Sequence, residues 1–339
     1  MKGGLEPAVQ PEKSSEDRPQ AGSRPLIARL TDFREFMILA IIIFGCALMS
    51  FASPIFMTFG NWSALLLQVS VECIVAIGMT ILLVSGGFDL SVGSTFALAG
   101  VITAMSISSG VPVFFALIFG LAIGVLVGLA NGLIIAKIGI NPFVTTLAMM
   151  SILRGTLLVI TGGRNISGLP ASFKVIGQGN FLTVQNPIWI ALILVLIGDI
   201  LLRKSRFFRQ NYYLGGNERA AFLSGIRVER LKVFNYALTG LLAALAGIIM
   251  TARLGTASVT AGTGLELAVI SAVIIGGASL KGGEGTVLGS FLGSLLMGIL
   301  VGALTLLGVD VYWNTLVIGS TLLIAVLIDN LGRRRRSLQ

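Results

Sequence analysis

Apolar residues fall into long uninterrupted runs along this chain, separated by short polar or glycine-rich stretches. Ten runs can be marked, and they cover residues 36–53, 63–84, 92–109, 112–136, 142–161, 187–202, 233–252, 266–280, 285–308 and 312–329. A helix needs about 20 apolar residues to cross the hydrocarbon core of a bilayer, and most of the runs reach that length. The pattern predicts an all-α polytopic membrane protein with about ten transmembrane helices, in a range of eight to ten.

One run differs from the others. Residues 266–280 are short for a span and end in glycine. A broken or re-entrant segment is tolerated in a membrane only where protein or a water-filled cavity covers its backbone. We therefore expect this region to be broken or re-entrant.

Composition supports the membrane assignment. Hydrophobic residues make up 55% of the 339 residues and charged residues only 12%, which is about half the charged share of a soluble domain. A soluble chain could not keep so much apolar surface away from water. The net charge of +9 comes with no basic soluble domain, so we expect no nucleic-acid partner.

Several chemistries are excluded directly. The chain has no histidine, and it has no P-loop string of the form G-x-x-x-x-G-K-[ST]. Cys46 and Cys73 lie singly in apolar runs and are expected to be small packing residues. We therefore predict no catalytic residue, metal site or cofactor site in this chain.

The charges gather in three blocks. Residues 1–35 hold 12 of the 39 charges, residues 203–232 hold ten, and Arg333–Arg336 hold four. Lys and Arg mark the cytoplasmic side of a membrane protein, and even numbers of spans between the blocks place all three there. We predict a disordered cytoplasmic tail at 1–35, a transmembrane domain at 36–330 with a cytoplasmic loop at 203–232, and a basic cytoplasmic tail at 331–339.

Glycines recur every fourth residue in two runs, from Gly120 to Gly132 and from Gly285 to Gly293. Such stripes let helix backbones approach closely in a membrane. Two interpretations stay open, tight packing within the subunit and a seam between two copies.

The polar segment from Tyr212 to Val228 has the features of a short helix. Gly215 and Gly216 end one element, Asn217 is a good N-cap, and a helix of about two turns fits before Gly225. That helix is too short to span and too apolar to stand alone in water. It could lie on lipid, or it could dock a cytoplasmic partner.

Five interior polar residues are candidates for a transport pathway. A carboxylate at the position of Glu72 costs about 2.5–3.5 kcal/mol in mid-membrane, so it should face a cavity or a partner, or be a protonated or paired structural group. Asp89 and Glu266 could bind substrate or could stabilise the first turn of the helix that follows. Asn131 needs a hydrogen-bond partner, and Asn141 before a proline is typical of a helix start.

The Tyr212–Val228 segment and several glycine-rich stretches together resemble the permease subunits of bacterial ribose-type ABC importers. The resemblance covers roughly residues 36–330. It rests on Gly86–Ser94, Asn131-Gly132, Pro142–Leu147, Arg154-Gly155, Tyr212–Val228, Gly262–Glu266, Ile275–Leu280, Gly282-Gly283, Leu307–Trp313 and Ala325–Asp329. Members of this family commonly carry an uncharged amide-type residue near Glu72, so the carboxylate there is a departure.

The resemblance implies a sugar permease of the bacterial cytoplasmic (inner) membrane that pairs with a second permease copy and works by alternating access. A cytoplasmic ATPase subunit, which holds ATP and Mg²⁺, would bind the loop through a coupling helix, and an extracytoplasmic binding protein would deliver the sugar. The coupling residues carried over are Gly215, Gly216, Asn217, Glu218, Ala220, Ala221, Ser224 and Gly225.

Other classes of function remain to be weighed. An ion-coupled secondary transporter of a small polar solute is the alternative, with Glu72, Asp89 and Glu266 as ion sites. A secondary transporter needs no basic docking loop, however. A membrane enzyme would need a cluster of acids or metal ligands at one depth, and the sequence contains no such cluster.

Overall fold

The computed structural model describes residues 34–310 and 312–336, with side chains described from Glu35 to Leu327. The contacts between residues divide the chain into two units, Met1–Phe33 and Arg34–Gln339. Most of the predicted tail at 1–35, and the last three residues of the predicted C-terminal tail, therefore lie outside the described residues. The fold of the second unit is as follows.

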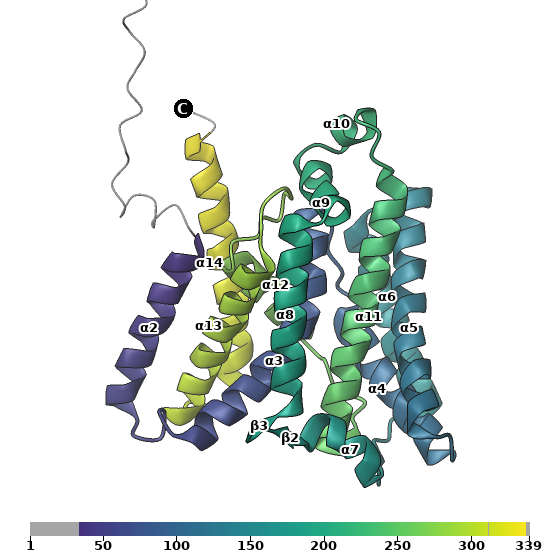
Figure 1. The fold of residues 1–339 in the computed structure, drawn as a ribbon, viewed down its shortest axis with the longest axis vertical. Helices are drawn as coiled ribbons and strands as arrows, with labels where there is room; N and C mark the ends of the chain where they lie inside the picture. The colour runs from purple at the N-terminus through teal and green to yellow at the C-terminus, as the bar shows by residue number, and fades with distance from the viewer. Residues whose placement is uncertain (1–33, 311, 337–339) are drawn as a thin grey trace, which may run out of the picture. The chain divides into compact units, whose positions relative to one another are not determined.

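Helices make up most of the described structure, and the strands are only two residues long (Figure 1). Each of the ten predicted apolar runs lies on a helix, which confirms the all-α polytopic fold. The helices are α2 (Arg34–Ala52), α3 (Phe59–Val84), α4 (Val92–Ser108), α5 (Val113–Leu133) with its π-helical extension η1 (Ile134–Ile138), α6 (Pro142–Thr161), α7 (Ala171–Gln178), α8 (Asn186–Lys204), α9 (Arg206–Gly216), α10 (Glu218–Leu223), α11 (Val228–Leu254), α12 (Leu265–Ile275), α13 (Val287–Leu306) and α14 (Tyr312–Arg336).

Within the described residues, seven helices are long and apolar enough to cross a membrane. They are α2, α3, α5 with η1, α6, α8, α11 and α13. Three shorter apolar helices complete the set, namely α4, α12 and the Tyr312–Leu327 part of α14. The seven long and three shorter helices together agree with the prediction of eight to ten spans.

The glycine stripes pack inside the chain. A Cβ atom on Gly124 would collide with the carbonyl of Gly240, and one on Gly128 would collide with the carbonyl of Tyr236, so α5 lies directly against α11. Gly293 lies in the same way against the carbonyl of Ala272 on α12. Of the two interpretations left open by the sequence, packing within the subunit accounts for both stripes.

The predicted broken segment at 266–280 is a short helix preceded by an irregular stretch. Helix α12 has only 11 residues and ends at Ile275. Before it, residues 255–264 fold back from the end of α11, and Gly262 lies backbone to backbone against Gly93 in the first turn of α4. The first turns of two shorter apolar helices, α4 and α12, are thereby brought close together.

Residues 162–186, between α6 and α8, form short elements that the apolar runs do not indicate. Helix α7 packs onto the end of α11, where Gly177 lies against the backbone of Arg253. Strand β1 (Ile166–Ser167) pairs antiparallel with β4 (Thr256–Ala257), with Ile166 opposite Ala257. Strand β2 (Asn180–Phe181) pairs antiparallel with β3 (Val184–Gln185), with Phe181 opposite Val184. These short ladders fix the connections between spans.

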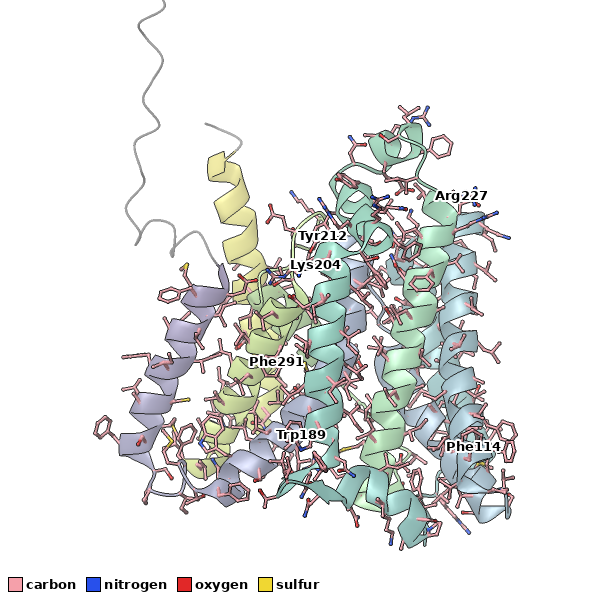
Figure 2. All side chains as sticks on the ribbon, in the orientation of Figure 1. Phe114, Trp189, Lys204, Tyr212, Arg227 and Phe291 are labelled. Atoms are coloured by element: carbon pink, nitrogen blue, oxygen red, sulfur yellow. The ribbon has the colours of Figure 1, made fainter. Side chains whose placement is uncertain are left out.

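Polar and aromatic side chains mark the two ends of the spans. Lys204, Tyr212 and Arg227 lie near α9 and α10, whereas Trp189 and Phe114 lie toward the opposite end, at which α7, β2 and β3 are also found (Figures 1 and 2). The side chains of the spans between these ends include many exposed apolar groups, such as Leu126 at 60% exposure. Exposed apolar surface along the spans, with charge at the ends, is the arrangement that a lipid bilayer favours. We refer below to the hairpin end and the opposite end.

Candidate functional site

Helices α9 and α10 form a hairpin beyond the ends of the long helices (Figure 1). Asn217 joins them in an extended conformation, and its side-chain oxygen accepts a hydrogen bond of 2.9 Å from the backbone N–H of Ala220. Gly225 follows with a left-handed φ of 84°, which favours glycine. The predicted short helix with its Asn217 cap and Gly225 stop is confirmed.

The two faces of α10 differ in exposure. Ala221 is only 3% exposed and packs within the hairpin, whereas Phe222 is 60% exposed and Leu223 is 72% exposed. Phe222 and Leu223 were not among the predicted coupling residues. A helix of six residues is too short for sequence periodicity to show which side faces outward. The apolar groups available to a partner are therefore Phe222 and Leu223, and Ala221 supports them from within.

The glycines of the hairpin have different environments. A Cβ atom on Gly215 would collide with the carbonyl of Val84 and with the backbone of Gly282 and Gly283. Gly215 is therefore a packing residue that lets α9 approach the end of α3. Gly216, in contrast, has open space around it.

A basic groove of about 790 Å³ opens beside α10. Its charged lining consists of four basic residues, Arg219, Arg227, Arg230 and Lys232, and two acidic ones, Glu218 and Glu229. Glu218 forms an ion pair of 2.7 Å with Lys232. Ser224, at the end of α10, donates a hydrogen bond of 2.9 Å to the carbonyl of Ala220. The excess of positive charge suits a partner surface that carries acidic residues.

A second cavity lies below the hairpin and has a volume of about 520 Å³. The turn after α3, the start of α6 and the link between α9 and α10 line it. Asn141 borders this cavity, but its side-chain oxygen accepts a hydrogen bond of 2.8 Å from the backbone N–H of Phe143. Asn141 thus caps α6, as its position before a proline suggested.

Asp89 and Asn131 meet in a buried polar cluster. One Asp89 oxygen accepts hydrogen bonds from the backbone N–H and the hydroxyl of Ser91, at 2.7 and 2.6 Å. The Asn131 side-chain nitrogen donates to the Ser91 hydroxyl at 2.9 Å and to the other Asp89 oxygen at 3.3 Å. The Tyr236 hydroxyl donates to the carbonyl of Phe88 at 3.1 Å. This cluster fixes the turn between α3 and α4.

Glu72 lines a third cavity, which has a volume of about 360 Å³ and which we call the Glu72 cavity. Gln68, one helical turn before Glu72 on α3, donates a hydrogen bond of 3.4 Å to its carboxylate. Arg253 at the end of α11, together with the hydroxyl-bearing Thr260 and Thr263, lines the same space. The cavity therefore offers hydrogen-bond donors and acceptors of several kinds to a small polar solute.

The 255–264 segment that walls the Glu72 cavity is held by long-range contacts. Arg154 on α6 donates hydrogen bonds of 3.0 Å to the carbonyls of both Val259 and Ala261. Glu266 lies in the first turn of α12, half-buried, and a Cβ atom on Gly93 would meet its carboxylate at 2.6 Å. The sequence does not indicate that Arg154 is a tether, because its acceptors are backbone carbonyls more than 100 residues away.

The five candidate pathway residues do not form one site. Glu72 lines the Glu72 cavity, and Glu266 follows the segment that walls it. Asp89 and Asn131 bond to each other elsewhere, and Asn141 lies near the hairpin end. Among the described residues, no group of three or more Asp, Glu, Cys or His side chains is placed to hold a metal ion.

These features define a class of protein: a multi-pass membrane protein with a cavity lined in part by Gln68, Glu72 and Arg253 and with a helical hairpin at one end. The sequence model of the family described as branched-chain amino acid transport system, permease component, matches residues 61–326. The chain belongs to this family of membrane permeases, in agreement with the resemblance found in the sequence.

Curated relatives cover most of the chain. The ribose import permease protein RbsC of Escherichia coli (strain K12) is 43% identical over 288 residues, which are 84% of this chain and 90% of the relative. RbsC of Bacillus subtilis (strain 168) is 43% identical over 306 residues, 90% of this chain and 93% of the relative. The L-arabinose transport system permease protein AraH of E. coli (strain K12) is 39% identical over 300 residues, which are 88% of this chain and 90% of the relative. No solved structure matches the chain.

Membership of this family settles the general role. The chain is a transporter component of the inner membrane, with several spans, and it is not an enzyme.

Proposed function

We propose that the chain is the membrane-spanning subunit of an ABC importer that moves a monosaccharide, ribose or a related sugar, into the cytoplasm by alternating access. The curated relatives support a sugar over the branched-chain amino acid named in the family description, because the named ribose and arabinose permeases match 84–90% of the chain. The observation that carries the proposal is the α9–α10 hairpin, which presents Phe222 and Leu223 to a partner beyond the spans.

The partners follow from this role. A cytoplasmic ATPase subunit docks on the hairpin, with Phe222 and Leu223 as apolar anchors and the basic groove facing its acidic groups. ATP and Mg²⁺ bind to that subunit. The hairpin end and both chain termini face the cytoplasm, as the positive charge of residues 203–232 indicates. A second permease copy completes the membrane part, and an extracytoplasmic binding protein delivers the sugar at the opposite end.

The Glu72 cavity is the proposed sugar-binding part of the pathway. Sugar hydroxyls donate well to carboxylates and accept from amide and guanidinium groups, and Glu72, Gln68 and Arg253 supply these groups around one space. Asp89 and Asn131 are proposed to support the helices around the pathway rather than to line it, because each is buried and hydrogen-bonded to the other. Asn141 and Glu266 contribute through the helix starts at which they lie.

An ion-coupled secondary transporter is the second candidate. One observation favours it, which is the carboxylate of Glu72 beside a cavity within a span. Asp89 gives it less support, because its carboxylate is only 1% exposed and already accepts hydrogen bonds from Ser91 and Asn131.

Uptake in proteoliposomes separates the two candidates. The permease is reconstituted with the cognate ATPase, and the binding protein is added on the opposite side together with labelled ribose, L-arabinose or leucine. We expect uptake of a sugar that needs both ATP and the binding protein and is unaffected by a protonophore. Uptake by the permease alone along a proton gradient would establish the second candidate, and uptake of leucine would overturn the sugar assignment.

A further inference from the structure

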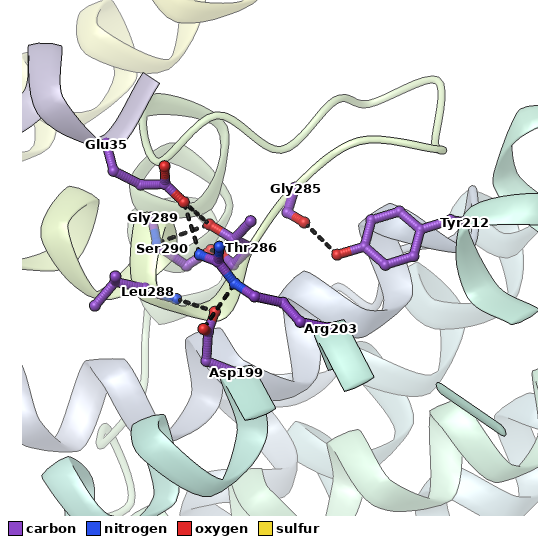
Figure 3. A network of polar contacts seen from close by, with 9 residues as sticks. All are labelled: Glu35, Asp199, Arg203, Tyr212, Gly285, Thr286, Leu288, Gly289 and Ser290. Carbon is purple, nitrogen blue, oxygen red and sulfur yellow. Dashed lines mark hydrogen bonds and ion pairs between the residues drawn. The ribbon is translucent and has the colours of Figure 1, made fainter. Parts of the chain in front are cut away.

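An arginine near the end of α8 joins three helices at the hairpin end (Figure 3). The Arg203 guanidinium contacts Glu35, at the start of α2, at 2.8 Å and Asp199, one turn earlier on α8, at 2.7 Å. The same Glu35 oxygen accepts a hydrogen bond of 2.9 Å from the hydroxyl of Thr286, the residue before α13. Arg203 thus contacts two carboxylates at once, Asp199 through Nε and Glu35 through Nη2.

The two carboxylates and Thr286 together hold the start of α13. Asp199 accepts a hydrogen bond of 3.0 Å from the backbone N–H of Leu288, and the Thr286 hydroxyl accepts one of 3.0 Å from Gly289. These N–H groups belong to the first turn of α13 and have no partner within the helix. Negative charge there is further stabilised by the helix dipole. The start of α13 is therefore attached to the end of α8.

The hairpin connects to the same place. A single residue, Ser205, separates the end of α8 from the start of α9, and its backbone is extended. The Tyr212 hydroxyl on α9 donates a hydrogen bond of 2.8 Å to the carbonyl of Gly285, just before α13 (Figure 3). Burial raises the pKa of the Tyr212 hydroxyl, so it remains a donor at neutral pH. A displacement of α9 is thus passed to the residues that precede α13.

Helix α13 leads from there toward the Glu72 cavity. It packs against α2, α3 and α12. Glu72 lies on α3, and α12 directly follows the 255–264 segment that walls the cavity. Contacts therefore run without a gap from α10 through α9 and α13 to the helices around the cavity.

We propose that Arg203 is a positioning residue for transport, which holds α8, α2 and the start of α13 together so that movement of the α9–α10 hairpin shifts α13 as a unit. The inference rests on the proposed function, since it assigns Arg203 to the link between the docked ATPase and the sugar pathway. Lysine cannot replace it fully, because an ammonium group lacks the planar fork that meets two carboxylates at once.

The test compares Arg203→Gln with Lys204→Gln in the reconstituted importer. Lys204 is the next residue on α8 and is exposed, and no hydrogen bond or ion pair of its side chain occurs among the described residues, so its variant removes the same charge without touching the network. The measurements are sugar uptake per ATP hydrolysed, stimulation of ATP hydrolysis by the sugar-loaded binding protein, and ATPase co-purification. Wild-type uptake in the same vesicles tests the proposed function separately.

For Arg203→Gln we expect co-purification to be kept, while uptake per ATP and the stimulation of hydrolysis fall about tenfold. Arg203→Lys should recover part of this loss, and Lys204→Gln should match the wild type. Equal coupling in the Arg203→Gln and Lys204→Gln variants would overturn the proposal. So would a loss confined to folding or assembly, in which the remaining Arg203→Gln complexes couple normally.

Tyr212→Phe provides a second test that does not depend on the stability of the Arg203 variant. It removes one hydroxyl and keeps the ring, so the packing of α9 is preserved while the bond to Gly285 is lost. We expect uptake per ATP to fall about threefold. Unchanged coupling in this variant would show that α9 does not act through the start of α13.

Discussion

Helix α10 of the hairpin and the 255–264 segment both lie between long helices, yet they are held in opposite ways. Helix α10 is shaped by neighbouring residues, with Asn217 capping it and Gly225 ending it. The 255–264 segment depends on distant groups, namely Arg154 on α6 and Gly93 on α4. A locally specified element can extend from the protein and keep its shape when a partner binds. A segment fixed by surrounding helices changes shape when those helices move, which suits a transport pathway.

The largest effect is expected from Leu223→Asp on the hairpin. A charge on this exposed apolar residue should weaken ATPase binding by about 3 kcal/mol, as for a central interface residue, and abolish uptake. The measurement is co-purification of the ATPase in detergent. Leu182→Asp is the matched control, because Leu182 is also 72% exposed but lies at the opposite end. Equal loss of co-purification in both variants would mean that the hairpin has no special part in binding.

Gly93→Val tests whether the 255–264 segment needs close backbone contact. The added side chain would collide with the carbonyl of Gly262 and the carboxylate of Glu266. We expect a loss of about 2 kcal/mol in stability, read as a lower melting temperature of the purified permease. Gly155→Ala on α6 is the control, since nothing lies within 4 Å of its added methyl group. If Gly93→Val melts like the wild type, the two segments are not packed as described.

Arg154→Gln removes the tether of the 255–264 segment. Two hydrogen bonds to a charged group are lost, so we expect about 1.5 kcal/mol lower stability and a faster exchange of amide hydrogens within 255–264. Arg164→Gln, which changes an exposed arginine after α6, should leave both measurements unchanged. Unaltered exchange in the Arg154 variant would contradict the role given to the tether.

The smallest effect is expected from Glu72→Gln. The amide keeps the size of the side chain and one acceptor but loses the charge, so we expect about a fivefold rise in the sugar concentration needed for half-maximal uptake. ATPase co-purification should not change, because the hairpin contacts α3 at Val84, at the end of the helix, and Glu72 lines neither cavity beside the hairpin. Normal uptake with the normal preference among sugars would remove Glu72 from the pathway.

The sequence predicted those features that depend on neighbouring residues. The apolar runs predicted the helices, and Asn217 with Gly225 predicted α10 and its ends. Its interpretation of Asp89 was partly right, since the carboxylate accepts from the backbone N–H of Ser91 just before α4.

Features that depend on distant residues could not be read from the sequence. Nothing in it indicates that Ala221 faces inward, that Asp89 and Asn131 meet, or that Arg203 joins α2 to α13. Each of these contacts follows from how the helices are placed against one another, and the helices themselves are nearly uniform in hydrophobicity. Composition is therefore enough to predict a membrane fold, whereas the packing of the helices determines the position of each polar side chain.

Amide hydrogen exchange of the permease with and without its ATPase tests the central claim most directly, that the α9–α10 hairpin is the docking element. We predict slower exchange at residues 216–232 when the ATPase binds, with no change at residues 180–185 at the opposite end. Exchange that stays unchanged at 216–232, or slows equally at 180–185, would contradict the claim.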